Sequence, residues 1–252
     1  MPLAVKAAAI VLRAVDYGEA DRVVTLLTRE RGKLAAFARG AKRSRKRFGG
    51  ALEPFTLLSA ELKERRGAEL WTLESVQPER AFGEIRSDLA RIACAAHACE
   101  VARALVRDAE PHPELFDLLA AYLARLDAAP ADPATLRAVQ LGILRAAGLA
   151  PRLDACARCG GPLPEGARLR LDPAEGGLVC GACGPVDPRA PMLSAAAVTE
   201  LARIEDEGLD AAPIARGPGA EIRDALEAFI EHHAGHRLAS RKFLDEVGPM
   251  LG

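Results

Sequence analysis

The sequence has few aromatic residues, no long hydrophobic run and no recognisable catalytic motif. Only 4% of its residues are Phe, Trp or Tyr. Ala, Leu and Val supply most of the apolar residues, a composition that favours helix in most of the chain. No stretch reaches the roughly 18 apolar residues that a membrane-spanning helix requires. The N-terminus also lacks the basic segment and apolar stretch of a secretory signal. We therefore expect a cytoplasmic protein with no membrane partner.

Signatures of the common enzyme classes are missing as well. Gly32-Lys33 lacks the upstream glycine of a phosphate-binding P-loop, and no Gly-x-Ser-x-Gly nucleophile elbow occurs. A zinc deaminase needs a proline directly before a Cys-x-x-Cys pair, whereas Ala155 and Val179 stand in those positions. Gly217-Pro218-Gly219 lacks the third glycine of a dinucleotide fingerprint. The sequence gives no reason to expect an enzyme, and we expect a binding protein.

Charge is distributed unevenly, although the net charge is only −1. Residues 1–80 contain 16 Lys and Arg against 10 Asp and Glu, whereas residues 81–252 contain 18 against 25. A basic first third predicts that a polyanion binds that part of the chain. With half of its 252 residues hydrophobic, the chain can form one or two domains that each bury a core.

Residues 1–80 are predicted to form a domain of β-structure. Leu58, Ala60 and Leu62 alternate with polar residues, as expected of a strand with one buried face. Turns are predicted at Asp16-Tyr17-Gly18 and at Arg31-Gly32, because glycine adopts positive φ freely. Five short strands suit a small barrel such as the OB-fold, and an SH3-like barrel also fits. The runs that predict the strands are residues 5–15, 22–28, 33–39, 52–63 and 69–77.

Residues 81–252 are predicted to form a helical domain with an insertion at about 151–190, which makes the fold class α+β. From Phe82 onward the apolar period changes to 3.6 residues. Asp132 is a candidate N-cap followed by Pro133 at the first helical position. The first predicted helix runs to about Arg107, and its apolar face is Ile85, Leu89, Ile92, Ala96 and Cys99. The second has the apolar face Leu115, Leu118, Leu119, Tyr122 and Leu126, and the third, which Gly148 closes, has Leu136, Val139, Ile143, Leu144 and Ala147. Later helices are predicted at 194–206, 219–234 and 237–247.

The insertion contains two Cys-x-x-Cys pairs, Cys156/Cys159 and Cys180/Cys183, separated by 20 residues. Each pair can turn both sulfurs toward one point, so two pairs supply the four thiolates of a tetrahedral zinc site. Because four thiolates leave no position open for water, we expect one structural Zn²⁺ and no catalytic metal. The residues between the pairs predict a short hairpin at 167–172 and 177–180.

Other uses of the cysteines suit the sequence less well. Two disulfides do not suit a reducing cytoplasm, and a thioredoxin-like redox pair belongs near a βαβ pattern that is absent here. Cys94 and Cys99 lie five residues apart in an Ala-rich helix and are expected to be small buried core residues.

A basic segment at residues 39–47 carries six positive charges and no negative one. A charge run is often only a solvated loop. Here it lies between predicted strands of a barrel, where it can neutralise phosphates of a nucleic acid. Phe37 and Phe48 flank the segment and could stack on bases, although core positions suit them better. The predicted DNA-binding residues are Lys33, Arg39, Lys42, Arg43, Arg45, Lys46 and Arg47.

Three histidines, His232, His233 and His236, stand near the end of a predicted helix. His232 and His236 share a face and could bind a metal, but no acidic HExxH arrangement accompanies them. Basic groups are also favourable at a helix C-terminus, and that interpretation is preferred.

Several segments together resemble the bacterial RecO family. Individually they are short, but they span nearly the whole chain in the expected order. They are residues 16–28 (DYGEADRVVTLLT), 31–34 (RGKL), 38–42 (ARGAK), 52–55 (LEPF), 144–151 (LRAAGLAP) before the first cysteine pair, 175–177 (EGG) and 240–244 (SRKFL).

The resemblance implies an N-terminal OB-fold, a helical C-terminal domain, and zinc in members that keep the cysteines. It implies a recombination mediator without catalytic chemistry, which binds single- and double-stranded DNA and anneals strands coated with single-strand-binding protein (SSB). It also implies partnership with RecR in loading RecA, and docking of the SSB C-terminal tail. The acidic balance of residues 81–252 departs from that pattern.

The sequence therefore predicts that the basic segment screens the repulsion between two approaching DNA strands. Neutralising about six phosphates would give a log–log salt slope near −5. Two rival interpretations remain. One is a zinc-ribbon protein that binds RNA or a transcription complex, and the other is a nucleic-acid enzyme with an unrecognised site.

Overall fold

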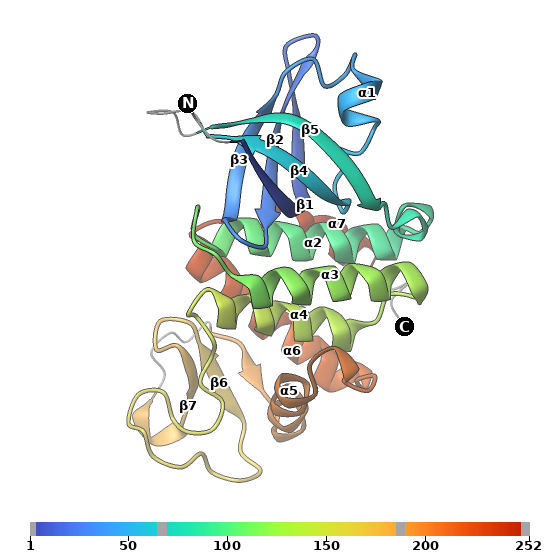
Figure 1. Ribbon diagram of the computed structural model, residues 1–252. Helices are drawn as coiled ribbons and strands as arrows, with labels where there is room; N and C mark the ends of the chain where they lie inside the picture. The colour runs from blue at the N-terminus through green and yellow to red at the C-terminus, as the bar shows by residue number, and fades with distance from the viewer. Residues whose placement is uncertain (1–3, 65–69, 185–189, 248–252) are drawn as a thin grey trace. The chain divides into compact units, whose positions relative to one another are not determined.

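The computed structural model describes residues 4–64, 70–184 and 190–247 (Figure 1). These residues form two compact units, which divide between Pro130 and Ala131. The first unit holds a barrel and two helices, and the second holds helices and a small sheet, so the predicted α+β class is confirmed. Residue 69 of the fifth predicted strand and residues 185–189 of the predicted insertion lie outside the described residues. A domain boundary near residue 80 stays a prediction.

The barrel closes in the strand order β1-β2-β3-β5-β4 within the described residues. All neighbouring strands are antiparallel except β3 and β5, which pair in parallel at Ala36–Trp71 and Phe37–Thr72. This order is that of an OB-fold rather than of an SH3-like barrel. The strands are β1 Ala4–Tyr17, β2 Asp21–Thr28, β3 Gly32–Ala38, β4 Leu57–Lys63 and β5 Trp71–Arg80.

The fourth predicted strand is shorter than its apolar run. Leu58, Ala60 and Leu62 are fully buried on one face, as predicted, but the strand begins only at Leu57. The residues before it reach the β1 bulge, where Val11 donates to the carbonyl of Thr56 and accepts from the N–H of Phe55. The apolar residues of this segment therefore cover the barrel core without joining the ladder.

Two helices complete the first unit, α2 (Leu89–Leu105) and α3 (Pro113–Ala128). The predicted apolar face of the first helix is wrong at Leu89, which is 54% exposed. Asp88 caps α2 by accepting from the N–H of Arg91, so Ile85 belongs to a separate 3₁₀ turn, Gly83–Ser87, with a different phase. Cys94 and Cys99 are buried as expected, and burial raises the pKa of Cys99 to about 12.

The loop between α2 and α3 packs against the turn between β2 and β3. Ala109 donates its N–H to the carbonyl of Lys33, at 2.8 Å. Gly32 has a φ of +68°, and a Cβ at this position would collide with the backbone of Glu110. Glycine is therefore required there both by the turn and by the close approach of the loop.

The second unit is built from four helices, α4 to α7, and the sheet β7-β6-β8 within the described residues. Asp132 caps α4 by accepting from the N–H of Ala134, Pro133 is its first residue, and Gly148 follows it with a φ of +72°, all as predicted. The elements are α4 Pro133–Ala146, α5 Ala195–Glu207, α6 Arg216–Ala234, α7 Ala239–Val247, β6 Leu169–Asp172, β7 Gly177–Val179 and β8 Met192–Leu193, with 3₁₀ turns Gly181–Cys183 and Gly208–Asp210; the one-turn helix α1, Arg45–Phe48, belongs to the barrel.

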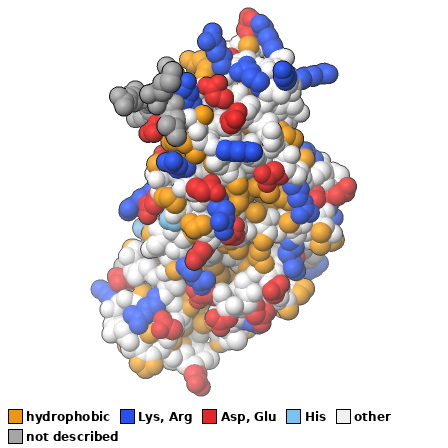
Figure 2. Space-filling model, viewed as in Figure 1, with side chains coloured by type: hydrophobic (Ala, Val, Ile, Leu, Met, Phe, Trp, Pro, Cys, Tyr) orange, Lys and Arg blue, Asp and Glu red, His pale blue; other side chains and the backbone are white. Residues whose placement is uncertain are grey.

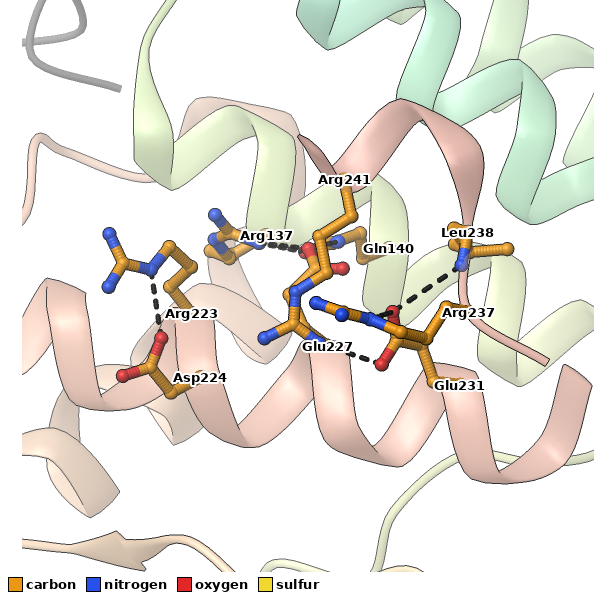
Figure 3. Close-up of polar contacts among 9 residues, drawn as sticks. All are labelled: Arg137, Gln140, Arg223, Asp224, Glu227, Glu231, Arg237, Leu238 and Arg241. Atoms are coloured by element: carbon orange, nitrogen blue, oxygen red, sulfur yellow. Dashed lines mark hydrogen bonds and ion pairs between the residues drawn. The ribbon is translucent and has the colours of Figure 1, made fainter. Parts of the chain in front are cut away.

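A buried polar cluster joins α4 to α6 (Figure 3). Arg137 donates to the carboxylate of Glu227 at 3.1 Å and to the side-chain oxygen of Gln140 at 2.6 Å. Gln140 donates in turn to Glu227, at 2.9 Å. Both charged side chains are at most 4% exposed, so the ion pair is nearly free of water. One turn further along α6, Glu231 pairs with Arg241 of α7 at 2.7 Å.

None of the helices in the described parts of the chain is both long and apolar enough to cross a bilayer.

Candidate nucleic-acid surface and metal site

The predicted basic segment folds as turns followed by the one-turn helix α1, which ends at Gly49 in the left-handed conformation. Phe48 is only 2% exposed and belongs to the barrel core, as its sequence position suggested. Because Phe48 anchors the helix, the charged residues around it stay at the surface. Figure 2 shows Lys and Arg side chains gathered over this end of the barrel.

Three of the predicted cations, Arg39, Arg45 and Lys46, are exposed. Among the residues that the structure describes, their side chains make no hydrogen bond or ion pair. Their charge is therefore not offset by a neighbouring carboxylate. These three residues, which we call the α1 cations, are the ones most able to bind phosphate.

Two further predicted cations are paired with acidic residues at the end of β1 and in the turn that follows it. Lys42 lies 2.7 Å from Asp16, and Arg43 lies 3.6 Å from Glu19. Arg22 also binds Asp16, at 3.0 Å. The hydrogen bond from Lys42, and then that from Arg22, lowers the pKa of Asp16 below its ordinary value. Part of the positive charge that the sequence counts is thus neutralised within the barrel.

The last two predicted cations hold the fold together. Lys33 is mostly buried; it donates to the carbonyl of Arg103 at 2.6 Å and pairs with Asp108 at 3.2 Å. Arg47 donates to the carbonyl of Arg39 at 2.6 Å, and its guanidinium lies over the ring of Phe48 at 4.9 Å. The sequence alone could not show that Lys33 has this structural role, because its partners in and after α2 are about 70 residues away along the chain.

Sequence analysis missed an exposed aromatic residue beside this region. Tyr17 is 61% exposed at the end of β1, and its ring meets that of Phe37 edge-to-face at a centroid distance of 5.6 Å. Phe37 was expected in the core; instead it is half-buried on the outer face of β3, because Leu34, Ala36 and Ala38 alternate inward. The strict alternation of β3 is the signal that could have placed it.

The four predicted cysteines come together in the second unit. All four sulfurs lie within 4.8 Å of one another, and three of the distances are 3.6 Å (Cys180–Cys183), 3.8 Å (Cys156–Cys183) and 3.9 Å (Cys159–Cys180). A tetrahedral site with metal–sulfur bonds of about 2.3 Å has sulfur–sulfur edges of about 3.8 Å. The observed distances fit such a site and are far longer than a disulfide bond, so the cluster can hold a metal ion.

Two thiols of this cluster, those of Cys156 and Cys183, have pKa values shifted in opposite directions. Backbone N–H groups of Cys159 and Cys180 face the sulfur of Cys156 and lower its pKa to about 6. Hydrogen bonding with the sulfurs of Cys159 and Cys180 favours the protonated form of Cys183 and, together with burial, raises its pKa to about 12. Four thiolates cannot coexist at such distances without a cation, and a divalent ion that binds here must displace protons.

Pairing with the small sheet positions the first cysteine pair. Arg152 donates to the carbonyl of Gly176 and accepts from the N–H of Leu178, both at 2.9 Å. Ala157 donates to the carbonyl of Leu178, at 2.8 Å. A Cβ on Gly177 would collide with the backbone of Arg152, so glycine is needed where the two segments meet.

The histidines at the end of α6 do not form a metal site among the described residues. The ring of His233 contacts that of Phe229 at a tilt of 59°, with centroids 4.7 Å apart, and Nδ1 of His236 lies 2.9 Å from the carbonyl oxygen of Ala234. Burial is the first cause that lowers the pKa of His233, and the second is the neighbouring His232. A lowered pKa favours the neutral form of His233, so a favourable charge at the helix C-terminus stays a prediction for this cluster.

Two family descriptions together match most of the chain: "Recombination protein O N terminal" over residues 1–82 and "Recombination protein O C terminal" over residues 86–242. The chain belongs to the RecO family. The "DNA repair protein RecO" of Anaeromyxobacter dehalogenans (strain 2CP-C) is 63% identical over 251 residues, 98% of each chain. The proteins of the same name from Myxococcus xanthus and Geobacter sulfurreducens are 48% identical over 240 residues (95% of this chain, 96% of the relative) and 39% identical over 246 residues (97% and 99%).

The RecO assignment confirms the resemblance seen in the sequence and is consistent with the OB-fold and the cysteine cluster. It does not favour the rival interpretation as a zinc-ribbon RNA-binding or transcription-associated protein. DNA repair is the role that the names of these relatives state.

Proposed function

We propose that this chain is a non-enzymatic mediator of DNA repair and homologous recombination that binds DNA through the α1 cations. The observation that carries the proposal is the exposure of Arg39, Arg45 and Lys46, without acidic partners among the described residues, on a barrel of OB topology. Membership of the RecO family and the names of the relatives support the DNA-repair part of the proposal.

The proposed mechanism is electrostatic. Two complementary strands repel each other through their phosphates, and cations placed between them reduce that repulsion while releasing counterions. The affinity of such a surface depends little on base identity, so one protein can bind both single- and double-stranded DNA. Annealing of complementary strands, including strands coated with SSB, follows without any covalent step.

The metal proposed for the cysteine cluster is a single Zn²⁺. Four cysteine thiolates with tetrahedral spacing are the donor set of structural zinc sites. When bound, the ion would cross-link the two Cys-x-x-Cys pairs, and four thiolate ligands would leave no position on it for a water molecule. Cys156, Cys159, Cys180 and Cys183 would hold it, and its role would be to stabilise the second unit.

The proposed partners beyond DNA are RecR, the C-terminal tail of SSB and, indirectly, RecA. The support for them is the family assignment. A chain with these partners would work in the cytoplasm, at the nucleoid.

Annealing of complementary oligonucleotides, with one strand pre-coated with SSB and no nucleotide present, tests the proposal. We expect a salt-sensitive acceleration with the wild-type chain and a strong reduction with the triple variant Arg39→Ser/Arg45→Ser/Lys46→Ser. Measurable binding to bare single strands without any acceleration would refute the annealing function. Degradation of a labelled oligonucleotide in the presence of divalent metal would refute the non-enzymatic part.

A further inference from the structure

An apolar surface lies uncovered on the outside of the barrel. Val15 and Tyr17 are 43% and 61% exposed, and they are two of the four large hydrophobic residues exposed in the described parts of the chain. The strand register places Val15 opposite Val23 and Val23 opposite Phe37, all on the outer face. Tyr17 contacts Phe37 from the same face. We call Val15, Tyr17 and Phe37 the aromatic face.

We propose that the aromatic face stacks unpaired bases and thereby makes the barrel bind single strands more tightly than duplex. The inference rests on the proposed DNA-binding function and adds to it the residues that distinguish the two forms of DNA. Aromatic rings bind bases of any identity, since every base has a π-face. In a duplex the bases are stacked on each other and present no free face to a protein ring.

The charges around the aromatic face favour a polyanion as its occupant. Arg13 shares the outer face of β1 with Val15, is exposed, and makes no ion pair with any described residue. Arg39 is exposed in the turn that directly follows β3, two residues after Phe37. The nearby carboxylates are engaged: Oδ1 of Asp21 accepts the N–H of Gly40 at 2.7 Å, and Asp16 and Glu19 pair with Lys42 and Arg43. Cations therefore border the rings in the way that the phosphates of a single strand require.

A purely apolar protein segment is a poorer candidate for this surface. Such a helix or strand would bury Val15 and the two rings, but it would leave Arg13 and Arg39 without a counter-charge. The OB-fold binds oligonucleotides through its strands 2 and 3 and the adjoining turns. The aromatic face lies on β1 and β3, on either side of Val23 of β2, and beside the turn at residues 18–20.

The test compares three probes of equal length: oligothymidine, an abasic oligomer with the same number of phosphates, and a duplex. Binding is measured by fluorescence anisotropy for the wild type, Tyr17→Ala and Tyr17→Phe. Tyr17→Ala should weaken binding of oligothymidine about fivefold or more, which is the scale of losing one base stack. Binding of the abasic oligomer and the duplex should change less than twofold. Tyr17→Phe should retain the wild-type affinity, because the ring remains.

Leu89→Ala is the matched control, since Leu89 is an exposed apolar residue of the same unit outside the aromatic face. It should leave all three affinities unchanged. Equal losses for oligothymidine and the abasic oligomer in Tyr17→Ala would overturn the stacking role. As an independent readout, oligomers containing 5-iodouracil should photo-cross-link to Tyr17 or Phe37, and adducts confined to other residues would also overturn it.

Failure of this inference can be told apart from failure of the proposed function. If the wild-type chain binds none of the three probes, the DNA-binding function itself is wrong. If the wild type binds all three and loses affinity on removal of the α1 cations, whereas Tyr17→Ala keeps the wild-type ratio of single strand to duplex, then only the stacking inference is wrong.

Discussion

The number of cations that contact phosphates can be measured from the slope of the logarithm of the DNA-binding constant against the logarithm of the salt concentration, here called the salt slope. The structure predicts a smaller salt slope than the sequence does. Six charges in residues 39–47 give a log–log slope near −5 for duplex DNA at about −0.9 per phosphate. In the structure, Lys42 and Arg43 are paired with acids, and Arg47 is engaged with the barrel. The three α1 cations alone would give a slope of about −2.7.

The double variant Arg45→Ser/Lys46→Ser tests this count. It should flatten the slope for duplex DNA by about 1.8 units, which is two phosphates at about −0.9 each. The control is Arg107→Ser/Arg125→Ser, which removes two exposed cations of the same unit outside the basic segment. The control should leave the slope unchanged.

The measurement is anisotropy titration of a labelled duplex at five or more salt concentrations. Duplex is the appropriate probe, because stacking of unpaired bases adds nothing to its affinity. A wild-type slope near −5 would show that the paired residues Lys42 and Arg43 leave their carboxylates for phosphates. An unchanged slope in Arg45→Ser/Lys46→Ser would place the DNA site away from α1, and the reasoning from exposed cations would be refuted.

Three further predictions concern the second unit. Removing metal with a chelator should lower the melting temperature of the second unit. In Cys159→Ser the chelator should have no effect, because one of the four ligands is missing. A zinc assay and thermal scans of both proteins measure metal content and melting temperature. Gly177→Ala should also destabilise the unit, because its Cβ collides with the backbone of Arg152, and circular dichroism during heating would detect a shift absent from Gly181→Ala, where a Cβ meets open space. Glu227→Gln should cost about 3 kcal/mol by leaving Arg137 charged and buried, while Arg137→Met/Glu227→Leu should recover much of that loss in denaturant titration.

Features that depend on neighbours in sequence were predicted correctly. The Cys-x-x-Cys pairs, the Asp132 N-cap with Pro133, and the Gly148 stop were all found from local patterns. In each of these features a few adjacent residues determine the geometry, because the backbone between them is short. The inward alternation of Leu58, Ala60 and Leu62 in β4 is local in the same sense.

Features that depend on distant residues could not be predicted. The helix phase at Leu89 is set by the separate 3₁₀ turn before it, which an unbroken 3.6-residue period does not represent. Arg137 and Glu227 are 90 residues apart, and no sequence pattern pairs them. A polar residue in an apolar stripe usually indicates exposure, whereas here two opposite charges are buried together.

The same limitation applies to the cations of the basic segment, whose role in binding DNA stays a prediction. A count of Lys and Arg treats every charge as available, but a salt bridge or a backbone carbonyl can occupy each of them in the fold. Lys33 is held by Asp108 and Lys42 by Asp16, and neither partner belongs to the segment. A surface with fewer available cations binds DNA less tightly at physiological salt and releases it more readily. A protein that anneals strands must also leave the paired product, so partial neutralisation of the cations by Asp16 and Glu19 would suit the proposed function. Replacing Glu19 with Gln removes the partner of Arg43 and should therefore steepen the salt slope while slowing release of the duplex, which stopped-flow dissociation would measure.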